Sequence, residues 1–242
     1  MKKLIIGGLA AIFLTSGCSS TSSTDELSTT IANTINTTAA TTTGDVTSEK
    51  TFIAEVWADN WFSLYVNGEL VGEDSVPITT ERSFNSETIS FKSTYPFTIS
   101  LVAKDFKEND TGLEYIGTDR QQMGDGGLIV QIKDAVTGEI VAITNEAWKA
   151  LAIHRAPLDK TCEKSSSPET ECTSQIIPEP DGWMTAGFND STWSTAVVYG
   201  ADAVGPKEGY NDITWDPTAK FIWSSDLEID NTILFRMTVA GS

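Results

Sequence analysis

Aromatic and polar residues that could contact a sugar ring fall in two long segments of the sequence, 104–127 and 156–217. The candidate ligand-binding residues are Asp119, Arg120, Trp183, Tyr210, Asn211 and Trp215. A flat aromatic side chain can pack against the C–H face of a sugar ring, while carboxylate, guanidinium and amide groups can bond its hydroxyl groups. The alternative for each aromatic residue is structural, with the ring fastening a long loop to the rest of the protein.

Two cysteines in the second segment predict a disulfide. Cys162 and Cys172 enclose a run of Glu, Lys, Ser, Pro and Thr that has no apolar residue to hold it in place. A zinc site would need two further Cys or His ligands, and His154 is the only histidine of the chain. We therefore expect a disulfide, which is typical of an oxidising compartment.

The common catalytic motifs are absent from the sequence. It contains no Gly-x-Ser-x-Gly elbow, no His-Glu-x-x-His zinc motif and no phosphate-binding loop. The 34 Asp and Glu residues make chance pairs of carboxylates inevitable, so such pairs alone do not indicate a glycoside hydrolase. We therefore predict a protein that is not an enzyme.

The charge of the chain argues against nucleic acid as a partner. The 242 residues include 34 acidic side chains against 16 Lys and Arg, which gives a formal net charge of −18. A polyphosphate backbone is bound by cationic side chains, and a chain this acidic would repel it. The hydrophobic fraction of 40% is sufficient for one sizeable core, so we expect one domain with appended segments.

The N-terminus has the pattern of a secretory signal. Two lysines precede an apolar run at 4–14, and small residues then lead to Cys18. This stretch resembles a bacterial lipoprotein signal, in which the cysteine is acylated and becomes the new N-terminus. Residues 1–17 would be removed, and Ser19 would direct the protein to the outer membrane or cell surface. The alternative is an ordinary secreted protein in which Cys18 lies near the cleavage site by chance.

The next segment, 18–50, is dominated by Ser and Thr and contains few large apolar side chains. Such a segment cannot bury enough apolar area to offset the entropy lost when it is ordered. We expect a disordered, flexible tether that connects a lipid anchor in the membrane to a domain at 51–242.

From Thr51 the sequence changes to the pattern of short strands. Apolar residues alternate with others at 61–66, and Asn67-Gly68 then gives the strongest two-residue hairpin signal. The segments with strand patterns are 52–57, 61–66, 69–72, 88–92, 97–104, 127–133, 139–144 and 232–239. We expect no helix longer than about two turns. Many short strands separated by turn residues predict an all-β sandwich or barrel.

Several motifs, in order along this part of the chain, carry a resemblance to a known family. The motifs are ADNWFSLYVNG at 58–68, GGLIVQI at 126–132, TNEAWK at 144–149, FNDSTW at 188–193 and AKFIWS at 219–224, followed by Phe235-Arg236. Together they resemble the galactose-binding-like jelly-roll domains found beside α-L-rhamnosidases and other glycoside hydrolases.

The resemblance implies an all-β, jelly-roll β-sandwich at 51–242 with a role in carbohydrate binding. In the hydrolases a catalytic barrel follows such a domain, and no sequence of that kind follows here. We therefore expect a non-catalytic surface lipoprotein that captures or adheres to polysaccharide. The alternative is a structural or protein-interaction module of the cell envelope that has no affinity for glycans and binds a surface protein.

Calcium is a ligand that this resemblance makes worth testing. The Asp-rich loop at 104–127 offers hard oxygen ligands, but its spacing is not that of an EF-hand. A solvated acidic loop explains the same residues, so we predict no metal site and no cofactor.

Several other residues of these motifs have structural explanations. We expect Trp148, Trp193 and Trp223 to pack in the core or at a sheet edge, since each has apolar neighbours in the sequence. Three roles are open for Arg236: it forms an internal ion pair, it lies on a strand with its charged end in solvent, or it contacts a sugar.

Overall fold

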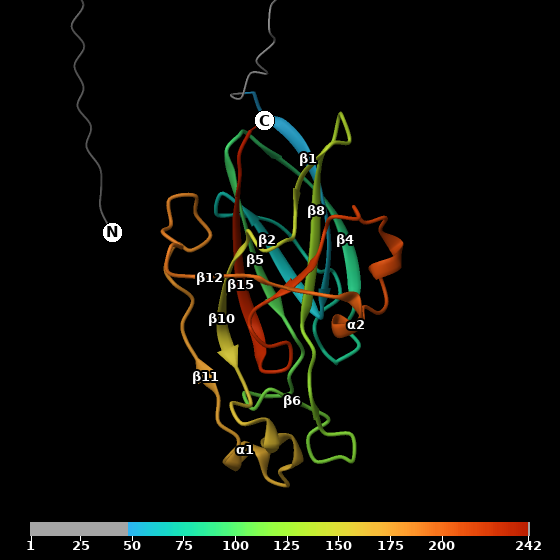
Figure 1. Ribbon diagram of the computed structural model, residues 1–242, viewed down its shortest axis with the longest axis vertical. Coiled ribbons are helices and arrows are strands. Elements are labelled where there is room, and N and C mark those ends of the chain that lie inside the picture. The colour runs from blue at the N-terminus through green and yellow to red at the C-terminus, as the bar shows by residue number, and fades with distance from the viewer. Residues whose placement is uncertain (1–47, 242) are drawn as a thin grey trace, which may run out of the picture. The chain divides into compact units, whose positions relative to one another are not determined.

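The computed structural model describes residues 48–241, which form two antiparallel β-sheets packed face to face (Figure 1). The predicted β-sandwich is therefore confirmed. The predicted signal peptide at 1–17, the lipidation site Cys18 and all but the last residues of the predicted tether at 18–50 lie outside the described residues.

The first sheet has six strands and is built around β1. Its strands are β1 (Lys50–Asp59), β4 (Asn85–Ser93), β8 (Gly127–Asp134), β9 (Ile140–Ile143), β13 (Val197–Tyr199) and β14 (Phe221–Trp223). Strands β4 and β8 pair with the two edges of β1, while β9 and β14 share the other edge of β8 and β13 extends the sheet beyond β14.

The second sheet has seven strands. They are β2 (Trp61–Val66), β3 (Glu69–Glu73), β5 (Phe97–Lys104), β10 (Lys149–Arg155), β11 (Gln175–Ile176), β12 (Ser194–Thr195) and β15 (Asp230–Val239). Their order is β11-β10-β15-β5-β2-β3, and β12 pairs with the same edge strand, β10, as β11 does.

The remaining elements are short. A two-stranded ladder joins β6 (Leu113–Glu114) to β7 (Gln122–Met123), and the helices are η1 (Lys160–Lys164), α1 (Pro168–Glu171), α2 (Ala201–Val204) and η2 (Tyr210–Asp212). The prediction of no helix beyond about two turns is thus confirmed for residues 48–241. None of the described helices has the length and apolar character needed to cross a membrane.

Every segment with a predicted strand pattern corresponds to a strand of the structure, although the predicted 139–144 extends one residue beyond each end of β9. The predicted hairpin is also confirmed, because β2 pairs with β3 across Asn67 and Gly68. Their φ angles are 52° and 95°, which are the positive values that a tight hairpin turn requires at both central positions.

Both faces of the central strands are buried. In β8 the side chains of Leu128, Val130 and Ile132 point into the core between the sheets, because successive side chains of a strand alternate between its faces. Ile129 belongs to a separate buried cluster on the outer face, where Gln131 is also buried. This double burial explains why the strand is a nearly continuous apolar run in the sequence.

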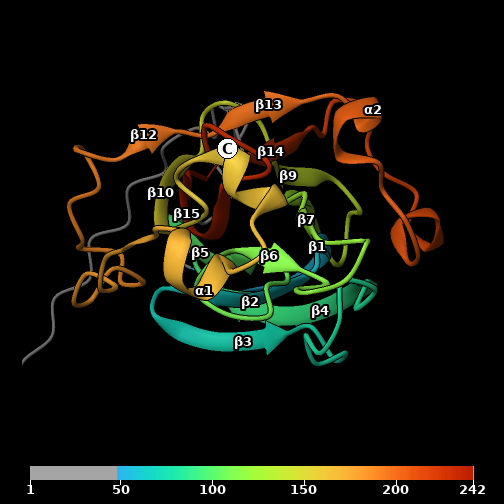
Figure 2. The same cartoon turned by 90° about the horizontal axis from the view of Figure 1, so that it is seen from below.

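The outer faces are covered by the long segment that joins β10 to β14. Its first part places Trp183 and Trp193 on the second sheet, against Val102 and Leu234. Its second part packs around Trp57 on the first sheet. Figure 2 shows this orange chain running from β12 through β13 to α2 along one side of the sheets. The segment therefore has its own apolar contacts and is fixed in place by them.

The predicted disulfide is present. Cys162 in η1 is bonded to Cys172, which follows α1, and the bridge spans 10 positions of the sequence. None of the side chains in η1 is buried, so this part of the chain is held by the disulfide and by polar contacts, among them the ion pairs of Lys160 and the hydrogen bonds from Gln121 to the backbone.

Removing this bridge is expected to lower the free energy of unfolding by about 2 to 3 kcal/mol, because the unfolded chain regains the entropy of an open loop. The variant is Cys162→Ser with Cys172→Ser, measured by urea denaturation beside the oxidised parent chain. An unchanged midpoint and slope would contradict the prediction.

Candidate functional site at the loop end

Strand register gathers several loops at one end of the sandwich. Asp59 at the end of β1 lies opposite Gly127 at the start of β8, and Arg155 at the end of β10 lies opposite Asp230 at the start of β15. The loop end, as we call it, is formed by residues 105–126, 156–174 and 224–229. It carries β6 and α1 at the bottom of Figure 1, and the opposite end holds the beginning of β1.

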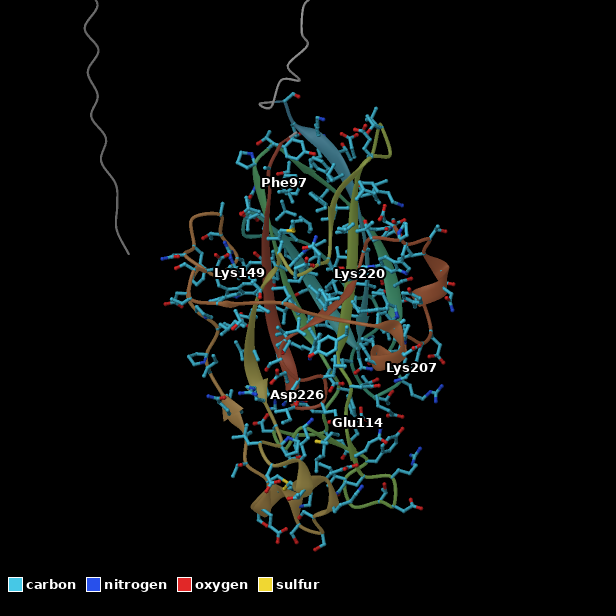
Figure 3. All side chains as sticks on the ribbon, viewed as in Figure 1. Phe97, Glu114, Lys149, Lys207, Lys220 and Asp226 are labelled. Atoms are coloured by element: carbon cyan, nitrogen blue, oxygen red, sulfur yellow. A yellow bond between two sulfur atoms is a disulfide. The ribbon has the colours of Figure 1, made fainter. Side chains whose placement is uncertain are left out.

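A polar groove of about 690 Å³ opens at the loop end. We call it the loop-end groove, and it is lined by Gln122, Met123, Gly124, Asp125, Lys160, Glu163, Tyr199, Ala203, Lys207, Ser225, Asp226, Leu227 and Glu228. Its only aromatic lining residue is Tyr199, whose hydroxyl donates a hydrogen bond of 2.9 Å to the carbonyl oxygen of Ser224. Figure 3 labels Asp226 and Lys207 in this part of the molecule.

The buried carboxylate of Asp230 shapes one wall of the groove. Its Oδ2 accepts hydrogen bonds from the hydroxyl groups of Ser224 at 2.7 Å and Ser225 at 3.2 Å, and from the backbone N–H of Asp226 at 3.1 Å. Its Oδ1 accepts from Nε of Arg155 at 2.6 Å. These bonds fix the turn at 224–229 and thereby the positions of its acidic side chains.

Lys160 is the cation of this wall. Its Nζ lies 2.9 Å from Oδ2 of Asp226 and 2.6 Å from Oε2 of Glu228. The hydrogen bond to Glu228 is the main reason that the pKa of Lys160 is raised, so the ammonium stays charged. The carboxylates of Asp226 and Glu228 therefore both pair with Lys160 in this wall of the groove.

Lys207 is the cation of the opposite wall. Its Nζ lies 3.5 Å from Oδ1 of Asp125 and 3.8 Å from Oδ2 of Asp59. The same ammonium lies 4.6 Å from the ring centre of Phe84, which holds it by a cation–π contact. Lys207 thus joins an exposed carboxylate to a buried one.

Buried carboxyl groups lie behind this wall. Burial, more than any neighbouring charge, raises the pKa of Asp59 and of Asp105 well above the ordinary range. Burial also raises the pKa of Glu114 to about 7. The Oδ2 atoms of Asp59 and Asp105 have no hydrogen-bond partner. Because charged carboxylates are costly at such positions, the protonated forms are favoured there.

The raised pKa of Glu114 predicts that the protein becomes less stable to unfolding as the pH rises. Below about pH 4.5 the carboxyl is protonated in both states, and between about 4.5 and about 7 the unfolded chain releases a proton that the folded chain retains. The free energy of unfolding should therefore fall as the pH rises through this window. Above it, Glu114→Gln should stabilise the protein by about 2 to 3 kcal/mol.

Urea denaturation at pH 4.5 and pH 8 checks this prediction. Glu146→Gln is the matched control, because Glu146 is exposed and no hydrogen bond or ion pair of its side chain contributes to the loop end. A gain from Glu114→Gln that is the same at both pH values would contradict the titration as its cause.

No group of three or more His, Cys, Asp or Glu side chains within 48–241 is arranged to hold a metal ion. At the loop end the positive charge beside the carboxyl groups of Asp59 and Asp125 is the ammonium group of Lys207.

The sequence-predicted ligand residues lie in three separate places. Asp119 and Arg120 are exposed at the loop end but do not line the groove, and the guanidinium of Arg120 stacks 3.8 Å from the ring centre of Tyr115. The other candidates lie on the outer faces of the two sheets. The structure therefore does not assemble the six residues into one site.

Tyr210, Asn211 and Trp215 lie together over the first sheet. The rings of Tyr210 and Trp215 stack with centres 5.8 Å apart, and Nε1 of Trp215 donates to the carbonyl oxygen of Tyr210 at 2.9 Å. Tyr210 also packs edge-on against Trp57. Asn211 is exposed beside them. This arrangement fastens the loop, as the structural alternative for these rings requires.

Trp183 lies over the second sheet and is only 1% exposed. Its ring packs against Tyr65 and Trp193, and its Nε1 donates to Glu179 at 3.0 Å. Apolar contacts on the sheet, which the sequence does not reveal, bury the ring in this structure. The predicted role of Trp183 in ligand binding stays a prediction.

The predicted packing of the three motif tryptophans is confirmed. Trp148, Trp193 and Trp223 are buried. Arg236 is 2% exposed, and its Nε donates to Oδ2 of Asp190 at 2.9 Å, which is an internal ion pair.

Sequence reasoning missed the residues that line the groove. Asp125 was visible as part of an acidic loop, but Lys160, Tyr199 and Asp226 come from three distant segments. No spacing in the sequence relates them, because only the register of the strands brings their loops to one end.

Comparisons of the chain with protein-family models, with curated proteins and with solved structures find no match.

Proposed function

We propose that this domain is a galactose-binding-like jelly roll that binds carbohydrate, without catalysis, in the loop-end groove. The observation that carries the proposal is the groove itself, which sets one aromatic ring, Tyr199, among polar side chains at the end of a rigid sandwich. Loops that a rigid scaffold holds at one end are common places for binding sites.

The lining of the groove matches the chemistry of a polyhydroxylated ligand. Carboxylates and ammonium groups accept and donate hydrogen bonds to hydroxyl groups, and Tyr199 offers a ring for a C–H face. The ring is anchored through its hydroxyl to Ser224, so its orientation is set before a ligand binds. The ordered motifs that resemble galactose-binding-like domains support the same class of ligand.

The cellular setting belongs to the same proposal. A signal ending at Cys18 and a Ser/Thr-rich tether support a lipid-anchored protein of the bacterial outer membrane or cell surface. The disulfide between Cys162 and Cys172 agrees with export to an oxidising compartment. The partner there would be a polysaccharide, which the protein captures or adheres to.

A glycan-binding screen of the purified full-length chain tests the proposal, with and without calcium. Tyr199→Ala should weaken binding by about three- to tenfold, because an aromatic ring contact contributes about 0.5 to 1.5 kcal/mol. Trp215→Ala is the comparison variant, since Trp215 lies outside the groove. Absence of binding to every glycan, or a loss confined to Trp215→Ala, would contradict the proposed site.

A second candidate function is a protein-interaction module, and exposed apolar residues support it. Val197 is 40% exposed and lines a second groove of about 470 Å³ beside β10, and Ile176 in the neighbouring strand β11 is 55% exposed. If this function is the correct one, the chain should form concentration-dependent oligomers or co-purify with a surface protein, and it should show no affinity for glycans.

A further inference from the structure

We infer that the loop-end groove selects sugars that carry a protonated amine over sugars that carry carboxylate or sulfate groups. This inference rests on the proposed carbohydrate-binding function and names the charge class of the ligand. It follows from how the charges of the groove are paired with one another.

Both lysines of the groove are already engaged by carboxylates. Lys160 lies within 2.9 Å of Asp226 and within 2.6 Å of Glu228, and Lys207 lies between Asp59 and Asp125. An anionic ligand would have to displace an existing carboxylate to reach either ammonium group. The groove therefore offers an anion no free cationic partner among its lining residues.

The carboxylates outnumber the lysines and remain accessible. The side chains of Asp125 and Glu228 are 47% and 49% exposed, so each can accept a further hydrogen bond from a ligand. Asp226 and Glu163 are the other acidic side chains of the lining, and Glu163 is paired with Lys164 at 3.0 Å. A protonated amine would thus meet charge-assisted acceptors on both walls.

Asp59 contributes no charge to this bias, because burial favours the protonated form of its carboxyl group. Asp125, whose Oδ1 lies 3.5 Å from Nζ of Lys207, therefore remains as the carboxylate that engages this lysine. The formal net charge of −18 for the whole chain adds a repulsive field for polyanions.

Calorimetric titration of the full-length chain at pH 6 and low salt tests the inference. The probes are tetramers of glucosamine, of N-acetylglucosamine and of galacturonic acid, which carry positive, neutral and negative charges. We expect the glucosamine tetramer to bind more tightly than its N-acetylated counterpart, and the galacturonate tetramer to bind least. The preference should weaken as salt is added, since exposed charges are screened.

Two variants of opposite charge make the test specific. Glu228→Gln should weaken glucosamine binding by about three- to fivefold, and Lys160→Gln should strengthen it by a similar factor, as expected for one exposed charge contact. Asp181→Asn is the matched control, because Asp181 is exposed and does not line the groove. A general loss of structure cannot produce effects of opposite sign.

The outcomes separate this inference from the proposed function. If the neutral tetramer binds and the charge variants have no effect, or if the galacturonate tetramer binds most tightly, the inference is wrong and carbohydrate binding stands. If none of the tetramers binds and the wider glycan screen is also negative, the proposed function itself fails.

Discussion

Replacement of Asp230 by alanine is expected to lower the free energy of unfolding by about 3 to 5 kcal/mol and to abolish the carbohydrate binding that we propose for the loop-end groove. Asp230 is fully buried and accepts four hydrogen bonds, including the one from Arg155. Removal of its carboxylate leaves these donors without a partner, and the desolvation of each unpaired polar group is costly.

The effect on binding follows from the same contacts. The turn at 224–229 carries Asp226 and Glu228, and it is held by the bonds from Ser224, Ser225 and Asp226 to Asp230. Without them the two carboxylates lose their fixed positions beside Lys160. Hydrogen exchange of the amide groups at 224–230 should therefore speed up in the variant, even under conditions where it is folded.

Two further variants keep this prediction testable. Asp230→Asn preserves the shape and most acceptor capacity, and it should lose less stability than Asp230→Ala. Asp226→Asn removes a partly exposed carboxylate of the same turn and should cost less than about 1 kcal/mol. Equal losses for Asp230→Ala and Asp226→Asn in urea denaturation would refute the central role of Asp230.

Replacement of Arg236 by methionine is the second large effect, with an expected loss of about 3 to 5 kcal/mol. The guanidinium donates to Asp190 at 2.9 Å, to Ser100 at 3.3 Å and to the carbonyl oxygen of Trp183. It therefore fastens both ends of the loop at 183–190 to the second sheet. Methionine fills similar space but leaves a carboxylate and a carbonyl oxygen without their donor.

The shape of the guanidinium also matters in this site. Arg236→Lys keeps the positive charge but lacks the planar fork that reaches several acceptors, so it should recover only part of the loss. A double-mutant cycle with Asp190→Ala should show a coupling energy above about 1 kcal/mol. Additive effects of the two substitutions would mean that the ion pair does not stabilise the fold.

Much of the fold was predictable because its strands carry strong local signals. The alternation in β2 and the turn at Asn67 and Gly68 fix a hairpin without reference to the rest of the chain. Strand β10 was missed because its sequence, KALAIHR, has an alternating pattern too weak to separate a strand from a helix. Strand β14 was missed because it has only three residues.

The site was less predictable than the fold. The composition of a loop can be read from the sequence, but the sequence does not show which loops the pairing of the strands brings together. Asp119 and Asp125 are both aspartates of one loop, yet only Asp125 lines the groove. The sequence did not indicate that Tyr199 lines a groove, because this residue follows two valines in a short strand and therefore resembles a core residue. Aromatic residues in long loops suggested a ligand, whereas those of this chain mainly hold the loops against the sheets.

The position of β15 constrains the order in which the domain can be completed during synthesis. This last strand of the described chain lies between β5 and β10, and it pairs with both along most of its length. A nascent chain that ends before residue 230 can form the first sheet and the hairpin, but its second sheet is split into two halves with open edges. The sandwich can therefore close only after β15 has left the ribosome and has paired with both β5 and β10.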